Sequence, residues 1–478
     1  MAVAELPLTL DRNSPTPLAA QVAAQLRRAI LEGTVRPPHH LPSSRRLAAD
    51  LGVSRGVVVR AYEQLTGEGY LESHGAAGTR VAVRADMRAD VRAPVRTAPP
   101  RPRAEPPRPV IDLTPGRPSD TPFQDRSWRT AWREALAEPG HVDLPPALGT
   151  PRLRAAIAGH LVTARGLAVD AEDILVTAGT SDALQLIATA LRTRSPAPRV
   201  LVEDPGYPTA RRVLAAAGAR VQTLPVGPDG LRAAQLTSLD PAPDAVLITP
   251  SHQYPLGGRM PVQERLALLE WAAEHRVLLL EDDYDSEFRH RRMPLPATAS
   301  LPSQAEVALL GSFSKTLSPW LRCGYLVVRG ASGHLVKETR TSLDTPVCGV
   351  LQSALAHYID DGGLARHTAR ARRGYAHRRA LLLDRLTDRP DLEIDALEEG
   401  LHAVVRLPAP VDAEDLAARA LAHGVRVVPL APYYAHQPPE NGLVIGYGAP
   451  TDLQLTRALD ILLQLIDTTV PPGGQDRT

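Results

Sequence analysis

The pattern of hydrophobic and polar positions divides the chain into three regions. Residues 1–83 are dense in helical spacing, with an apolar side chain at every fourth position from Leu18 to Ile30. Residues 84–109 hold seven prolines, seven arginines and few large apolar side chains, which is typical of a semi-rigid linker. From residue 110 to about 470, short apolar runs alternate with amphipathic stretches. We therefore expect two domains, 1–83 and 110–470, joined by the linker.

The first region predicts a winged helix-turn-helix. We expect three helices and two short strands: residues 17–32, a short helix that Ser43 or Ser44 caps and that ends at Gly52, residues 54–67 with Ser54 as the cap, and two strands within 71–83. Two helices joined by a tight glycine turn are the signature of a helix-turn-helix. The helix at 54–67, the second of this pair, would enter the DNA major groove with its N-terminus first.

The long third region predicts an α/β fold. Six short apolar runs are strand candidates: Ile174–Val176, Arg199–Glu203, Ala245–Thr249, Val277–Glu281, Val307–Gly311 and Tyr325–Val328. Helical stretches such as Ser181–Arg192 and Val262–His275 lie between them. Such alternation favours a mostly parallel sheet covered by helices. A smaller α+β portion is expected to end the chain, from about residue 345 onward.

Composition narrows the class of protein. The chain is 44% hydrophobic with a formal net charge of +1, so any nucleic-acid binding must come from a local surface. Its two cysteines, Cys323 and Cys348, cannot form a disulfide framework, and no run of about 18 apolar residues occurs. We expect a cytoplasmic protein with no membrane span and no metal centre. Of the 54 basic residues only Lys315 and Lys337 are lysines, so few amines are available for Schiff-base chemistry.

Several residues of the first region are suited to DNA. Ser54, Arg55 and Gly56 stand at the N-terminus of the helix expected at 54–67, where backbone amides and the helix dipole favour phosphate. Arg60 follows one turn later in the same helix. For any single arginine, a solvated helix face is the alternative. Residues 1–80 hold nine arginines against seven acidic residues, so a dimer would be needed for useful affinity.

Residues 10–82 resemble the GntR family of winged-helix regulators almost without gaps. The match is carried by Leu-Pro-Ser-Ser-Arg-x-Leu-Ala from Leu41, Gly-Val-Ser-Arg from Gly52, Ala-Tyr-Glu from Ala61 and Glu-Gly-Tyr-Leu from Glu68. The resemblance implies binding to double-stranded DNA. It implies these contacts: Arg45, Ser54, Arg55, and the wing glycines Gly75 and Gly78.

The strongest chemical motif lies in the third region, from Gly311 to Gly324. A predicted strand ends at Gly311 and delivers a hydroxyl-rich loop that carries Lys315. Ser312, Ser314 and Arg322 offer hydroxyl donors and a guanidinium for a phosphate. A lysine beside a phosphate cradle is what a Schiff base with pyridoxal 5'-phosphate (PLP) requires. The alternative is a surface lysine in a serine-rich loop.

A second motif follows the strand predicted at Val277–Glu281. Asp282 would lie at the carboxyl end of that strand, where α/β sheets place their ligands. A buried carboxylate there can keep a pyridine nitrogen protonated, and Tyr284, on the same side of the extended chain, can bond a ring hydroxyl. Here the alternative is an ordinary acidic loop.

Three shorter pieces agree with a PLP site. Thr180 and Ser181 stand at a strand-to-helix turn whose amides can bind phosphate. Tyr207 can stack on a pyridine ring, and Tyr254 follows another predicted strand end. Taken alone each signal is weak, because a tyrosine is more often part of a core.

Together, residues 10–465 resemble the MocR/GabR group, which joins a GntR domain to a fold type I aminotransferase domain. The resemblance implies PLP on Lys315, Asp282 at the ring nitrogen, Tyr284 at the ring hydroxyl, and Tyr254 where aminotransferases usually have an asparagine. It implies phosphate contacts from Thr180, Ser181, Ser312, Ser314 and Arg322, and a head-to-tail homodimer. One departure concerns activity: Val444 stands where many aminotransferases have the arginine that grips the substrate carboxylate.

Three functions remain open from the sequence. The first is a PLP-dependent transcription regulator whose effector is PLP, alone or with an amine or amino acid, controlling vitamin B6 or amino-acid metabolism genes. The second is a working aminotransferase with an accessory DNA-binding domain. The third is a DNA-binding protein whose second domain is an empty scaffold.

Overall fold

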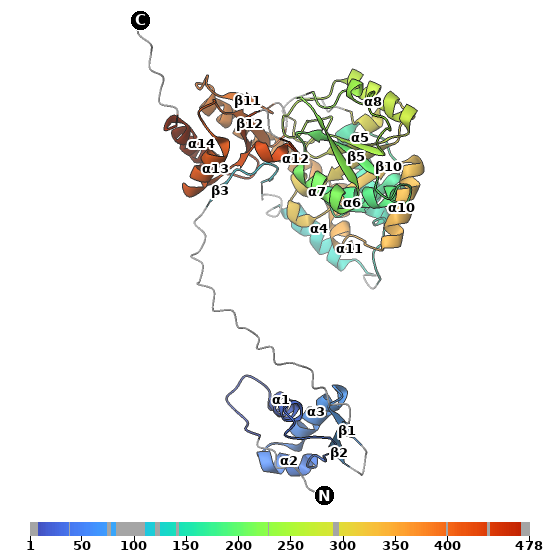
Figure 1. The fold of residues 1–478 in the computed structure, drawn as a ribbon, viewed down its shortest axis with the longest axis vertical. Helices are drawn as coiled ribbons and strands as arrows, with labels where there is room; N and C mark the ends of the chain where they lie inside the picture. The colour runs from blue at the N-terminus through green and yellow to red at the C-terminus, as the bar shows by residue number, and fades with distance from the viewer. Residues whose placement is uncertain are drawn as a thin grey trace. The chain divides into compact units, whose positions relative to one another are not determined.

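The chain forms two compact units, Met1–Glu105 and Pro106–Thr478, in a computed structural model (Figure 1). The structure describes residues 8–37, 39–73, 78–82, 110–119, 125–139, 143–227, 229–289, 296–397, 400–436 and 440–469. The predicted linker at 84–109 lies outside these residues. Within them, no helix has both the length and the apolar character needed to cross a membrane.

The first unit contains the predicted three helices and two strands. They are α1 (Leu18–Leu31), α2 (Ser44–Leu51), α3 (Arg55–Gly67), β1 (Leu71–Ser73) and the antiparallel β2 (Thr79–Val81). Ser43 is the residue that caps α2, accepting a hydrogen bond from the amide of Arg46 at 3.3 Å, and Gly52 ends the helix at φ +61°. Ser54 occupies the N-cap position of α3, but its side chain makes no capping bond. That expectation was therefore correct in position and wrong in hydrogen bonding.

The second unit is built on a mixed seven-stranded sheet of order β4-β10-β9-β8-β7-β5-β6. Its strands are β4 (Ile174–Thr177), β5 (Arg199–Asp204), β6 (Arg220–Pro225), β7 (Ala245–Ile248), β8 (Leu278–Asp283), β9 (Val307–Ser312) and β10 (Gly324–Val328). Strand β10 pairs antiparallel with both neighbours, whereas the four pairings from β9 to β6 are parallel. This confirms the predicted, mostly parallel sheet.

Helices cover both faces of this sheet, because successive side chains along each strand point to opposite faces and both faces are apolar. In β4, Leu175 packs into one apolar cluster while Ile174 and Val176 pack into another. The helices on the Leu175 face are α6 (Thr180–Leu191), α7 (Pro208–Ala216) and α10 (Gly330–Leu343). Those on the other face are α4 (Arg126–Ala137), α5 (Pro151–Arg165), α8 (Val262–His275) and α11 (Gly349–Asp360).

A smaller lobe completes the second unit. Its antiparallel sheet has the order β11-β12-β15-β14 and packs against α12 (Gly363–Leu386), α13 (Ala413–Ala422) and α14 (Asp452–Asp467). The strands are β11 (Glu393–Asp395), β12 (His402–Arg406), β14 (Val428–Pro429) and β15 (Gly442–Gly446). The two-residue β13 (Val425–Arg426) pairs in parallel with β3 (Ile111–Asp112), which comes from the start of the unit.

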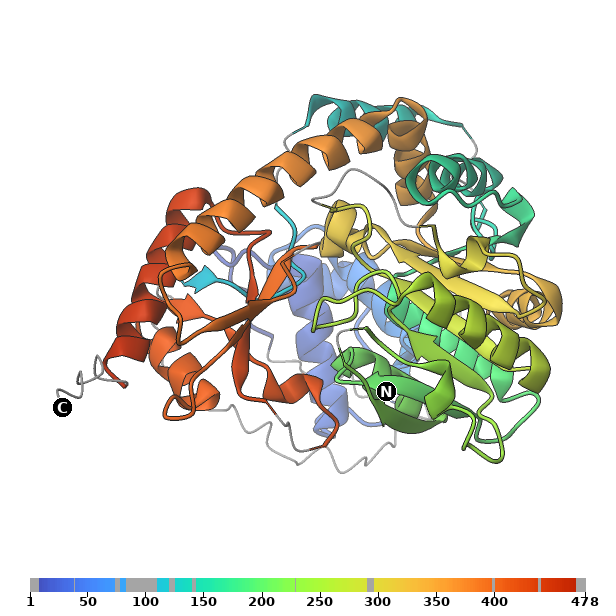
Figure 2. The same ribbon diagram turned by 90° about the horizontal axis from the view of Figure 1, so that it is seen from above.

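The boundary expected near residue 345 is therefore wrong in two respects. Helix α11 belongs to the large lobe, because Leu351 and Leu355 are buried against α4 and α5. The small lobe instead begins with α12, the long helix that Figure 2 shows running from that lobe toward α4 and α5. It also recruits β3, which lies far earlier in the sequence.

Candidate functional site

A cavity of about 160 Å³ lies at one edge of the large sheet. All ten residues predicted to bind a cofactor line it, together with Gly179 and Pro319: Thr180, Ser181, Tyr207, Tyr254, Asp282, Tyr284, Ser312, Ser314, Lys315 and Arg322. They come from the ends of strands β4, β5, β7, β8 and β9 and from the loops that follow. Ligands of open α/β sheets bind in such a position.

Lys315 lies in the short helix α9 (Phe313–Thr316), directly after β9. Its Nζ donates a hydrogen bond to the carbonyl of Gly116 at 2.6 Å. Burial lowers the pKa of Lys315 from its ordinary value, while the nearby Asp282 opposes that shift. A depressed pKa favours the neutral amine, which is the nucleophilic form.

Gly116 is a site residue that the sequence analysis missed. It follows β3 and has φ +75°, and a Cβ there would lie 2.4 Å from Lys315 Nζ. Only a glycine therefore lets this segment approach the lysine so closely. A signal was present, because Gly116 comes shortly after the apolar run at Val110–Leu113, but nothing local connects it to a residue 199 positions later.

Asp282 is buried on β8 and carries an unusual proton affinity. Burial raises its pKa to about 7; Asp283 adds to the shift and Lys315 opposes it. Its Oδ1 atom has no hydrogen-bond partner among the described residues. An unpaired buried carboxylate oxygen is costly, so this atom is ready to accept a hydrogen bond from a ligand.

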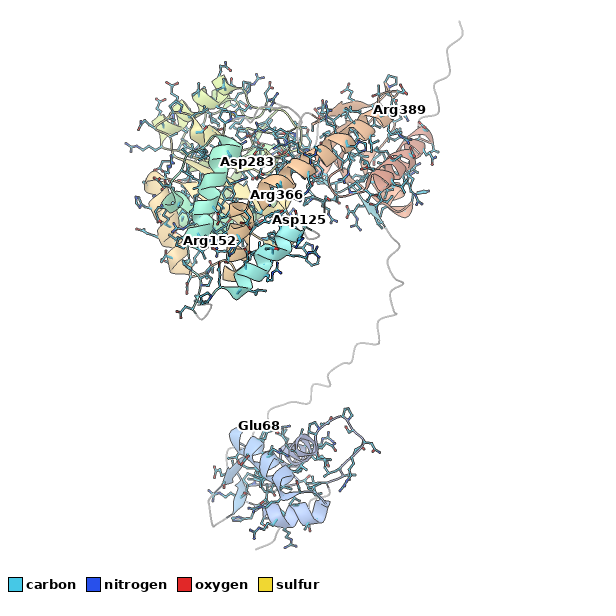
Figure 3. All side chains as sticks on the ribbon, turned by 180° about the vertical axis from the view of Figure 1, so that it is seen from behind. Glu68, Asp125, Arg152, Asp283, Arg366 and Arg389 are labelled. Carbon is cyan, nitrogen blue, oxygen red and sulfur yellow. The ribbon has the colours of Figure 1, made fainter. Side chains whose placement is uncertain are left out.

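The end of β8 is tied to α5 behind the cavity. Arg165, the last residue of α5, lies 2.9 Å from Asp283 and 3.5 Å from Glu281. Figure 3 labels Asp283 near one end of this helix and Arg152 near the other. All three groups of the network are buried, so the ion pairs fix the strand end that carries Asp282.

The opposite end of the cavity is suited to an anion. Helix α6 starts at Thr180, and its N-cap Gly179 has φ +92° and no capping side chain. A Cβ at Gly179 would come within 4.0 Å of the guanidinium of Arg322, which is itself exposed. Helix amides, the hydroxyls of Ser312 and Ser314 and this guanidinium thus converge where a phosphate can lie.

Aromatic side chains form the remaining wall. The ring of Tyr254 lies 6.1 Å from that of Tyr207, 5.1 Å from Tyr284 and 5.4 Å from Tyr433. Val444, fully buried on β15, belongs to the apolar cluster that packs against Tyr254. Of the residues that line the cavity, Arg322 alone is an arginine.

The predicted DNA contacts lie on the surface of the first unit. Six of them are exposed: Arg45, Ser54, Arg55, Gly56, Arg60 and Gly78. Arg55 reaches back from α3 to α2, where its Nε donates to Ser44 Oγ at 3.3 Å. Gly75 lies outside the described residues. The surface thus presents the N-terminus of α3 and one edge of the wing.

Comparison with known proteins agrees with both units. Residues 18–81 match the model of bacterial regulatory proteins of the gntR family, and residues 108–462 match aminotransferase class I and II. The chain is 40% identical to the HTH-type pyridoxine biosynthesis transcriptional regulator PdxR of Corynebacterium glutamicum, covering 94% of this chain and 95% of that one. The chain belongs to the MocR/GabR-type regulators of the GntR family.

Two further comparisons concern the whole chain and the fold of its second unit. It is 36% identical to the probable rhizopine catabolism regulatory protein MocR of Rhizobium meliloti, over 92% of each chain. Its fold is similar to an alpha-aminoadipate aminotransferase of Thermus thermophilus solved with N-(5'-phosphopyridoxyl)-L-leucine, with a TM-score of 0.67, 26% identity, and coverage of 76% and 93%. The regulator therefore combines a GntR helix-turn-helix with a fold type I aminotransferase domain.

Proposed function

We propose that this transcription regulator holds PLP on Lys315 and changes its DNA affinity in response. The proposal is carried by one observation: a single cavity joins a half-buried lysine, a buried carboxylate oxygen without a described partner, and a helix N-terminus suited to an anion. Bound PLP would supply an aldehyde that condenses with the amine and a ring that withdraws electrons. The phosphopyridoxyl ligand of the Thermus enzyme is consistent with this choice.

Each residue has a role that its position supports. Asp282 accepts a hydrogen bond from the ring nitrogen through its free Oδ1. The amides at Thr180 and Ser181, with Ser312, Ser314 and Arg322, hold the phosphate. Tyr207 covers the ring face, and Tyr254 and Tyr284 line the side of its hydroxyl.

The side of the cavity that a substrate would use favours sensing over transamination. Val444 packs against Val404 and Leu430 where many aminotransferases carry a guanidinium. A carboxylate left there without a partner would be costly to bury. PLP itself is therefore the preferred effector, with an amine or amino acid as the alternative, and the name of the Corynebacterium relative supports vitamin B6 genes as targets.

The effector must act through a difference in binding energy. PLP can shift the DNA affinity only if it binds one arrangement of the two units better than the other. We propose that the arrangement is that of a head-to-tail homodimer in the cytoplasm, because paired recognition helices read two half-sites.

The direct test is a titration of the DNA upstream of the regulator's own gene, at fixed salt, with and without PLP. We expect sequence-specific binding whose affinity changes when PLP is added. The variant Lys315→Ala should bind the same DNA with an affinity that does not respond to PLP. If specific binding responds only to an added amine or amino acid, that compound and not PLP is the signal. Sustained turnover with an amino donor and a keto acid, without specific binding, would favour the enzyme instead.

The chain provides its own control for the covalent bond. Lys337 is the second of the two lysines and lies on α10, 3.5 Å from Asp173. Borohydride reduction of the PLP-loaded protein followed by peptide mapping should place the label on Lys315. The variant Lys337→Ala should label like the wild type, and a label confined to Lys337 would refute the site.

A further inference from the structure

A buried hydrogen-bonded chain extends from the cavity wall to the junction with the small lobe. The hydroxyl of Tyr284 lies 2.8 Å from Nδ1 of His252, and the same Nδ1 lies 2.8 Å from Oδ2 of Asp285. The side chains of His252 and Asp285 are 0% and 3% exposed. Tyr284 is the member of the chain that lines the cavity.

The carboxylate decides which way these hydrogen bonds point. An ionised carboxylate can only accept, so Nδ1 of His252 carries the hydrogen and donates it to Asp285. The hydroxyl of Tyr284 then meets an N–H and can only accept from it. Its own hydrogen is left for another acceptor, which a ligand in the cavity that Tyr284 lines would supply. Burial raises the pKa of Tyr284 well above its ordinary value, so the hydroxyl keeps this hydrogen.

We propose that Asp285 and His252 are positioning residues that fix Tyr284 as a hydrogen-bond donor into the cavity. This inference rests on the proposed function, because the acceptor would be the ring hydroxyl oxygen of PLP. Donation to that oxygen stabilises its negative charge. The negative charge on that oxygen is present when the nitrogen joining Lys315 to the cofactor has lost its proton. The hydrogen bond therefore lowers the pKa of that nitrogen, which is the pH at which the absorbance of the bound cofactor changes.

The small lobe holds this pair in place. Gly400 has φ +81°, and a Cβ there would lie 2.2 Å from Asp285 Oδ2 and 2.7 Å from His252 Cε1. His402 of β12 packs with its ring 5.3 Å from that of His252, and its Nε2 lies 3.0 Å from the carbonyl of Pro255. The hydrogen-bonded chain thus has no room to rearrange while the lobes are packed together.

A metal ion is the competing occupant of this cluster. Among the described residues, His252, Asp285 and His402 bring one ligand atom each within 4.8 Å of one another. However, Nδ1 of His252 is already engaged by a carboxylate and a phenol, and Nε2 of His402 by a carbonyl. Hydrogen bonding therefore explains the cluster better than coordination does.

The test is a pH titration of the visible absorbance of the PLP-loaded full-length protein. Tyr284→Phe removes the donor and should raise the spectral pKa by about one pH unit, a tenfold change in proton affinity. His252→Leu should do the same. Asp285→Asn is the sharpest variant, because a neutral amide no longer obliges Nδ1 to carry the hydrogen. A bare Nδ1 can then accept from the tyrosine hydroxyl, which turns that hydroxyl away from the cofactor while all side-chain volumes persist.

Two variants separate positioning from a structural role. His252→Asn keeps a donor near the position of Nδ1 and should restore most of the wild-type spectral pKa. His275→Gln on α8 is the control, because its amide can keep the contact with the carbonyl of Trp271 and it lies outside the chain, so the spectral pKa should not move. Other titratable groups near Tyr284 stay constant across the series: Asp282, Glu203, Tyr254 and Lys315.

The outcomes are distinct. A shift in Tyr284→Phe without any in His252→Leu and Asp285→Asn would overturn the positioning role. One equivalent of metal bound in the wild type and lost in His402→Gln would also overturn it, because Nδ1 would then be a ligand. A wild-type protein that shows no lysine-linked absorbance band at all would instead refute the proposed function.

Discussion

The recognition surface and the cavity of this regulator use their residues in opposite ways. The DNA-facing side chains Arg45, Arg55 and Arg60 are exposed and stand within one short stretch of the chain. Most of those around Lys315 are buried or half-buried, with Arg322 exposed at the rim, and they are drawn from strand ends and loops between Gly116 and Arg322. Replacing a residue of the surface should therefore change binding alone, whereas replacing one in the cavity should also change stability or proton affinity.

The largest expected effect is at the rear of the cavity. Gly400→Ala adds a Cβ at positive φ against Asp285 and His252, and we expect it to destabilise the second unit by about 2–5 kcal/mol. Gly374→Ala, in the middle of α12 with no atom within 4 Å of the new Cβ, is the control and should stabilise by about 0.5–1 kcal/mol. Chemical denaturation of both variants measures this, and equal effects would contradict the tight packing of Gly400.

Asp282 should make the stability of the PLP-free protein depend on pH. Burial raises its folded pKa to about 7, so the folded protein keeps a proton that the unfolded chain releases at about pH 4. Its contribution is complete below about pH 4, falls as the pH rises toward 7, and is then constant. Glu203, whose pKa burial also raises to about 7, acts in the same direction.

In Asp282→Asn we expect the fall in stability between pH 4 and pH 7 to shrink by about 2–4 kcal/mol. Denaturation at several pH values measures how the free energy of unfolding depends on pH. Glu203→Gln is a second variant, which removes the contribution of Glu203 to that dependence. PLP affinity should fall only modestly in Glu203→Gln but strongly in Asp282→Asn. An unchanged slope in both variants would show that neither carboxyl holds the proton.

Arg55→Ala tests the surface alone. Loss of one guanidinium at the N-terminus of α3 should weaken specific DNA binding by about 1–3 kcal/mol and leave PLP binding unchanged. If the contact is to phosphate, the dependence of log affinity on log salt should flatten by about one. Arg373→Ala on α12 removes an exposed arginine of the second unit and serves as the control. Equal losses in the two variants would argue against a recognition helix.

The smallest expected effect separates folding from binding within the first unit. Ser43→Ala removes the capping bond to Arg46 and should destabilise this unit by about 1 kcal/mol. Ser54 makes no capping bond, so Ser54→Ala should leave stability nearly unchanged and reduce DNA affinity instead. Thermal unfolding and DNA titration of the two variants would show this exchange. A stability loss confined to Ser54→Ala would reverse the assignment.

Much of this molecule is readable from its sequence because the signals are local. Helix spacing, the Ser43 cap and the turn at Gly52 place the helix-turn-helix within one or two residues. Six apolar runs predicted the strands β4, β5 and β7–β10, and the residues that follow several of them line the cavity. These features depend on neighbours in the chain, or on the rule that strand ends share one edge of a sheet.

The tertiary structure alone decided which distant segments complete the site. Gly116 reaches Lys315 from 199 residues away, and Gly400 seals the pair of Asp285 and His252 from the small lobe. Helix α11 joined the large lobe because its apolar face fits between α4 and α5. No local periodicity encodes such contacts, because they arise only when the packing of two lobes excludes water and buried polar atoms must find their partners in distant segments.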